Sequence, residues 1–197
     1  MTDLVAPRPI AWISSIDRQG RENLAPFSYF QAACSSPALI TVAIAWHSNG
    51  RMKDTLSNIL NNQEFTINHV SESCLEAMNK TSVGLEPGIS EWEAAGIDGS
   101  DACTVRPRRV AKSLAGLECR LQQAIPLGRN PKTGGPSSSL IIAQVVHFWV
   151  QPSLLKRDDA GKFQSIDPAL LASIGRLGGI AYTRTEDRID LPAPRGD

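Results

Sequence analysis

The sequence predicts a mainly β protein, with an antiparallel β core and short helices in the connections. Residues 9–16, "PIAWISSI", are rich in β-branched and aromatic side chains, and the polar turn "DRQGREN" follows them. After the half-apolar stretch 23–37, residues 38–46, "ALITVAIAW", are almost wholly apolar, as expected of a strand buried on both faces. Parallel strands need long crossovers, so strands joined by such short turns should pair antiparallel. This pattern favours a barrel or a sandwich over a doubly wound sheet.

The remaining elements are predicted from hydrophobic spacing and turn residues. Leu56, Ile59 and Leu60 have helical spacing, which predicts a short helix within 47–63 that Asp54 or Ser48 could cap. The other expected elements are a strand at 64–70, a helix at 71–82, one or two helical turns within 89–96, a hairpin of strands 114–127 and 138–150, and a helix within 167–179 with Asp167 as its cap and Pro168 in its first position. No break in composition divides the chain, so residues 1–197 are expected to form a single domain.

Charge and cysteine content exclude several classes of function. The 20 Lys and Arg residues balance 20 Asp and Glu residues, so there is no basic excess to attract a nucleic acid. No apolar run approaches the roughly 20 residues of a membrane span, and the N-terminus lacks the pattern of a signal peptide. We therefore expect a cytoplasmic protein with no nucleic-acid or membrane partner. The four cysteines are scattered without a CxxC pair, so we expect reduced thiols and no metal site.

The chain has no GxGxxG after its first strand, no GxxxxGK[ST], no HExxH and no GxSxG. Two other local features could bind a ligand. The first feature is "KDT" at 53–55. It is either a solvated lysine before an Asp N-cap, or an anion site of lysine, threonine hydroxyl and free helix N–H groups. The second is the hydroxyl-bearing stretch 23–36, which is either a half-exposed strand whose serines face water or a ligand-lining strand. Taken alone, each feature is more simply explained by its first interpretation.

Together, the two features indicate a phosphorylated, ring-bearing cofactor. A phosphate needs one or two cations with neutral donors, and the organic part needs spaced polar contacts and an apolar wall. The candidate polar contacts are Asn23, Ser28, Ser35 and Ser36, and the candidate wall residues are Trp12, Tyr29 and Phe30.

A series of segments then resembles the flavin reductase-like family of FMN-binding split-barrel proteins. The segments are "PRPIAWISSID", "NLAPFSYF", "KDTLSNI", "EFTIN", "EAMNKTS", "GISEWEAAGI", "LECRL" and "IGRLGGIAYTR", and they cover nearly the whole chain in order. The family includes flavin reductase components of two-component monooxygenases and the electron carrier flavoredoxin. The resemblance implies a six-stranded antiparallel Greek-key split β-barrel, a homodimer, and FMN bound non-covalently near the subunit interface.

The resemblance also assigns site residues. It implies that Asn23, Ser28 and Tyr29 line the ribityl chain and ring, and that Ser35 and Ser36 lie near the isoalloxazine. Lys53 and Thr55 would bind the phosphate, and Asp54 would fix that turn. Arg176 and Tyr182 would lie near the flavin face or the partner subunit.

The function implied by the resemblance is an NAD(P)H:flavin oxidoreductase, with NADH or NADPH as electron donor and a monooxygenase or other acceptor as partner. Hydride transfer to flavin is the cofactors' own chemistry, so no catalytic side chain is expected. Two alternatives stay open: a flavoredoxin-like electron carrier without a nucleotide site, and a non-enzymatic flavin-binding barrel.

Overall fold

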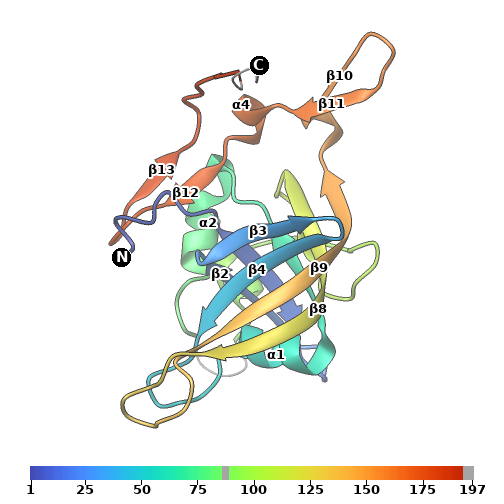
Figure 1. Ribbon diagram of the computed structural model, residues 1–197. Coiled ribbons are helices and arrows are strands. Elements are labelled where there is room, and N and C mark those ends of the chain that lie inside the picture. Colours follow the sequence, from blue (N-terminus) through green and yellow to red (C-terminus); the bar gives the residue numbers. More distant parts are fainter. Residues whose placement is uncertain (86–88, 193–197) are drawn as a thin grey trace.

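The computed structural model, which describes residues 1–85 and 89–192, is organised around one curled antiparallel sheet (Figure 1). Its strand order is β2-β1-β5-β8-β9-β4-β3, and every neighbouring pair is antiparallel. The seven strands are β1 (Ala11–Ile16), β2 (Glu22–Phe27), β3 (Phe30–Ser35), β4 (Ala38–Ala45), β5 (Glu64–Asn68), β8 (Ala115–Leu127) and β9 (Ser138–Val150). The predicted mainly β, antiparallel split-barrel fold is confirmed.

The sheet closes towards a barrel because of the chain path between β2 and β3. Only Ser28 and Tyr29 separate these strands, yet β2 and β3 occupy opposite edges of the sheet. Two residues can join them only if the end of β2 lies close to the beginning of β3, so the sheet curls until these two strand ends meet at what we call the seam. The sheet has seven strands where six were expected, because residues 22–35 form two strands and not one.

Short helices and small strand pairs complete the fold. The helices are α1 (Asp54–Asn62), η1 (Glu72–Cys74), α2 (Leu75–Lys80), α3 (Glu91–Ala95), η2 (Pro152–Leu154) and α4 (Pro168–Leu171). The strand pairs are β6 (Gly99–Ser100) with β7 (Arg109–Val110), β10 (Leu155–Arg157) with β11 (Phe163–Ile166), and β12 (Ile174–Arg176) with β13 (Tyr182–Arg184). Within residues 1–85 and 89–192, no helix has the length and apolar character needed to cross a membrane.

Strand β1 packs on both faces, which divides the core into two parts. Ile13 faces the barrel interior, where α1 contributes Leu56 and Ile59. Trp12 points the opposite way and packs with Met78 of α2 and Trp92 of α3. Alternating side chains on one strand therefore fill the barrel and also hold α2 and α3 against its outer wall.

Two helix predictions need correction. Helix α1 begins at Asp54, and its N-cap position is Lys53, which makes no side-chain capping bond. The helix expected within 167–179 ends at Leu171, since Ala172 adopts a left-handed φ of 45° and Ile174–Arg176 then pair with β13. The predicted cap of that helix is confirmed, because the Asp167 carboxylate accepts hydrogen bonds from the N–H groups of Ala169 and Leu170.

Candidate functional site

A small cavity of about 180 Å³ lies beside the seam, where β2 ends. Its lining residues are Ile10, Pro26, Phe27, Ser28, Met78, Asn79, Ser82, Arg176 and Tyr182. The Arg176 guanidinium carbon lies 4.4 Å from the centroid of the Tyr182 ring, so the cation is stacked on the aromatic face. The structure therefore brings Ser28 of the first predicted segment together with Arg176 and Tyr182 of the last.

Phe27 connects this cavity to the beginning of α1. Phe27 lines the cavity, and Lys53 Nζ lies 5.6 Å from the centroid of its ring. Helix α1 begins directly after Lys53, and its first intrahelical bond runs from Ser57 N–H to the Lys53 carbonyl. The preceding helical N–H groups are thus left without helical acceptors, as at every helix N-terminus. A lysine, free N–H groups and a positive helix end suit an anion here.

Asn23 and Thr55, to which the family resemblance assigns contacts with the ribityl chain and the phosphate, bond to each other. Asn23 Nδ2 donates a hydrogen bond of 2.7 Å to Thr55 Oγ1, and both side chains are buried. The bond fixes β2 to the first turn of α1. The Thr55 hydroxyl keeps its own hydrogen for another acceptor, because Asn23 uses only a lone pair.

Asp54 is exposed and lies 3.4 Å from Nη1 of Arg51, so it pairs with the turn before the helix. Tyr29 is also exposed and its ring lies 5.9 Å from the Arg8 guanidinium carbon. These positions agree with Asp54 fixing its turn and with Tyr29 lying at the seam. Their contact with a cofactor stays a prediction.

Ser35 and Ser36 lie apart from the rest of the predicted set. Both are exposed at the far end of β3, which begins at Phe30, close to Ser28. Six extended residues at roughly 3.3 Å each separate the two ends by about 17 Å. Within one chain, the structure therefore does not bring Ser35 and Ser36 to the cavity that Ser28 lines.

Two polar residues of the seam cavity, and an arginine beside Ser28, were missed by sequence reasoning. Asn79 and Ser82 line the cavity, and Asn79 Oδ1 accepts a hydrogen bond of 3.1 Å from the Tyr182 hydroxyl. They belong to the segment "NKTS" at the end of α2, whose small polar residues were the available signal. Arg8 Nε lies 3.4 Å from Ser28 Oγ, within the segment "PRP", where an arginine between prolines gave no chemical signal.

Arg8 is buried, and its guanidinium is held by the protein. Its Nη1 donates to the carbonyls of Thr2 and Val5 at 2.6 and 2.8 Å, and its Nη2 donates to Leu177 at 2.9 Å. Neutral carbonyls satisfy its donors without cancelling its charge. Arg8 therefore places a fixed positive charge behind Ser28.

A larger cavity, of about 480 Å³, lies on the other side of Ile10; the predicted wall residue Phe30 lines it, but none of the predicted polar and phosphate contacts does. Most of its wall is apolar, with aromatic rings from Phe30, Phe148 and Trp149. Its titratable wall residue besides Arg8 is His69, whose Nε2 lies 2.8 Å from Ser173 Oγ. Burial lowers the pKa of His69 to about 4, so the ring is neutral at pH 7.

The seam cavity suits a flat apolar group, and Lys53 with the N-terminus of α1 suits an anionic group. The protein is therefore a split barrel with a candidate site for a cofactor that has both groups. Comparison with known proteins agrees with this class. Residues 4–171 match the family described as flavin reductase like domain, and the chain belongs to that family.

Several relatives extend along nearly the whole chain. An uncharacterized protein of Halalkalibacterium halodurans is 34% identical over 190 residues, which is 96% of this chain and 87% of that protein. Nitrilotriacetate monooxygenase component B of Bacillus cereus is 32% identical, with a TM-score of 0.87 over 96% of this chain and 90% of the other. The 2-nitrobenzoate 2-nitroreductase of Pseudomonas fluorescens is 31% identical, with a TM-score of 0.83 over 98% and 88% of the two chains.

Proposed function

We propose that the protein binds FMN non-covalently at the seam and acts as an NAD(P)H:flavin oxidoreductase. The observation that carries this proposal is that Phe27 lines the same cavity as Ser28 and Arg176 and that Lys53 Nζ lies 5.6 Å from the centroid of the Phe27 ring. The lysine and the helix end beside it suit a phosphate, and the cavity has an aromatic and apolar wall. FMN has both parts in one molecule.

The protein's own groups would hold the cofactor as follows. Lys53 and the N-terminal N–H groups of α1 bind the phosphate, with the Thr55 hydroxyl as a further donor. Ser28 would offer a hydroxyl to the polar atoms of the ring system, and Arg176 with Tyr182 would pack against it. Bound there, FMN would supply the acceptor for hydride from NADH or NADPH, and the protein would supply orientation and electrostatics.

The larger cavity favours a reductase over a simple electron carrier. Ile10 lines both cavities, so a ligand in the apolar cavity would lie next to one at the seam. A carrier needs one cofactor site only, whereas a reductase must also admit a donor or an acceptor. Transfer of reduced flavin to a monooxygenase agrees with the name of the Bacillus cereus relative, which is a monooxygenase component.

A second candidate function is direct reduction of an aromatic acceptor. The apolar cavity has three aromatic rings in its wall, and His69 Nδ1 is buried there without a hydrogen-bond partner among the described residues. A flat substrate with one polar group suits that lining. The relative named as a 2-nitrobenzoate nitroreductase makes 2-nitrobenzoate the first compound to test.

We also propose a homodimer that packs along β3. Every residue of this edge strand from Gln31 to Ser35 is exposed, including Ala32, Ala33 and Cys34. An open, largely uncharged edge strand is a natural surface for a second copy. The flavin contacts predicted for Ser35 and Ser36 require such a partner. Sedimentation should give the dimer mass for the wild type, and Ala33→Arg should shift the population to monomer.

The function is tested by titrating purified protein with FMN and then adding NADH or NADPH without oxygen. A reductase binds FMN, loses its yellow colour with one of the nucleotides, and turns over added flavin. If only dithionite bleaches the bound flavin, the protein is a carrier. Failure to bind FMN at all would rule out both activities.

A further inference from the structure

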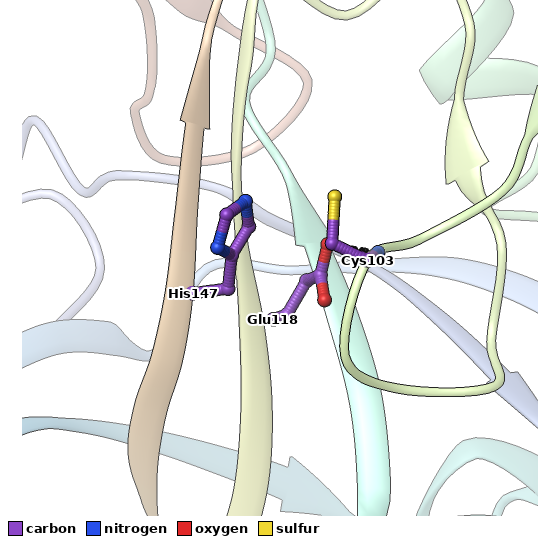
Figure 2. A group of neighbouring side chains, drawn as sticks. All are labelled: Cys103, Glu118 and His147. Carbon is purple, nitrogen blue, oxygen red and sulfur yellow. Dashed lines mark hydrogen bonds between the residues drawn. The ribbon is translucent and has the colours of Figure 1, made fainter.

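Three metal-ligating side chains meet on the outer face of the barrel wall, away from the seam. Glu118 in β8 and His147 in β9 are paired residues of neighbouring strands, and Cys103 lies in the segment between β6 and β7. Figure 2 shows the thiol, the carboxylate and the imidazole gathered at one place. One ligand atom from each residue lies within 4.8 Å of the other two. The sequence predicted no metal site, because these residues are far apart along the chain.

A β-bulge in β9 brings His147 to this face. Cys119 pairs with Val145 and Glu118 pairs with His147, so Val146 is an extra residue in β9. Ile141, Ala143 and Val145 face the core. Without the bulge, the two-residue period would turn His147 towards the core as well. The bulge instead places its imidazole beside the Glu118 carboxylate.

Glu118 holds the segment that carries Cys103. Its side chain is fully buried, and Oε1 accepts a hydrogen bond of 2.8 Å from Cys103 N–H. Oε2 accepts two bonds of 2.6 Å, from the N–H and the hydroxyl of Thr104. An ionised carboxylate has about four lone-pair positions, so Oε1 keeps one for a further partner. The carboxylate thus fixes the backbone of Cys103 and remains able to bind a cation.

We propose that Cys103, Glu118 and His147 form a zinc site, with water as the fourth ligand. One thiolate, one imidazole and one carboxylate are the ligand types that Zn²⁺ accepts, and three protein ligands leave one open position. The Cys103 thiol releases its proton to solvent when its sulfur binds the metal. Cys103 is exposed, which gives the metal an entry path and the fourth position access to water.

The required movement is small. Ligand atoms at zinc distances of about 2.0–2.3 Å lie roughly 3.3–3.8 Å apart in a tetrahedron. The three atoms must therefore approach one another by at most about 1.5 Å from their present limit of 4.8 Å. Rotation of the exposed Cys103 side chain can supply much of this change. Bound zinc would then tie the segment between β6 and β7 to the central strands of the barrel.

The test measures zinc bound by the purified protein after chelator treatment, addition of zinc chloride and dialysis. The wild type should retain about one zinc per chain and should melt at a higher temperature with zinc than without it. Cys103→Ser and His147→Gln each remove a proposed zinc ligand. Loss of a residue that only hydrogen-bonds a metal ligand weakens binding by roughly 10–100-fold, so each of these changes should weaken zinc binding by more than that. Cys34→Ser and His47→Gln, which change the other exposed cysteine and a histidine in the turn after β4, should bind zinc as the wild type does.

Circular dichroism verifies that each variant is folded, and Cys103→Ala replaces Cys103→Ser if the serine variant is not. The zinc site is overturned if the wild type retains no zinc at saturation. It is also overturned if either ligand variant retains as much zinc as the wild type, or if either control loses zinc to the same extent.

Discussion

Asn23 Nδ2 donates a buried hydrogen bond of 2.7 Å to Oγ1 of Thr55, which joins the edge strand β2 to the first turn of α1. The two residues are 32 positions apart, and the bond is the direct link between the two sequence features that indicated a cofactor. It sets the position of the helix N-terminus relative to the seam. Lys53, which directly precedes the helix, is positioned by the same link.

Thr55→Val should destabilise the protein by about 1–3 kcal/mol, because it leaves the buried Asn23 amide without its acceptor. Urea unfolding of the flavin-free protein measures the change. The exposed residue Asn61 of the same helix offers a control, since Asn61→Ala should change stability by no more than about 0.5 kcal/mol. Combining Thr55→Val with Asn23→Ala should cost less than the sum of the single changes, and strict additivity would show that the bond is not formed in solution.

Lys53→Ala should weaken FMN binding by about 1.5–3 kcal/mol, the scale of a hydrogen bond to a charged group. Riboflavin lacks the phosphate, so its affinity should change much less. Fluorescence titration with both ligands measures the difference. Lys162→Ala, in the turn between β10 and β11, is the matched control and should leave both affinities as in the wild type. Equal losses for FMN and riboflavin would contradict a phosphate contact of Lys53.

His69 should make stability depend on pH between about 6.5 and 4. Burial lowers the pKa of His69 from 6.5 to about 4, so below pH 6.5 the unfolded chain binds a proton that the folded chain does not. The contribution of neutral His69 to the free energy of unfolding is fully present above pH 6.5 and is lost as the pH falls. The total loss is about 3 kcal/mol. His69→Gln keeps a polar partner for Ser173 and removes the titration.

Urea unfolding of the wild type and of His69→Gln at several pH values isolates this contribution. The stability difference between the two proteins should be constant above pH 6.5 and should shift against the wild type towards pH 4. Parallel pH profiles would show that His69 does not titrate differently in the folded and unfolded states.

Glu118→Gln should destabilise the protein by about 1.5–3 kcal/mol in the presence of a chelator. The glutamine amide has one acceptor oxygen and one NH₂ group, which cannot accept a hydrogen bond. The NH₂ group would therefore face the donors of either Cys103 or Thr104, and their hydrogen bonds would be lost. Glu76→Gln, on the exposed face of α2, is the matched control and should change stability by no more than about 0.5 kcal/mol. Thermal or urea unfolding gives both values, and a result for Glu118→Gln as small as the control's would mean that the carboxylate does not hold the segment.

Much of the local structure could be predicted from the sequence. The hairpin of β8 and β9, the strands β1, β4 and β5, and the cap of α4 all follow from apolar spacing and turn residues. The division of residues 22–35 into β2 and β3 could not be predicted, because the break at Ser28 and Tyr29 arises where two sheet edges meet. The helix expected within 167–179 was too long for a similar reason, since pairing with β13 outweighed helical spacing.

The candidate site shows the same division. The sequence by itself determined which residues have donors, cations and rings, and it placed Ser28, Lys53 and Arg176 in separate segments. Only the tertiary structure decided that these segments meet at the seam, that Asn23 and Thr55 bond to each other, and that Ser35 and Ser36 lie at the far end of β3. It also decided, through one bulged residue, that His147 faces Glu118. Side-chain chemistry is a property of each residue, whereas proximity depends on strand order and register, which arise only when the whole sheet closes.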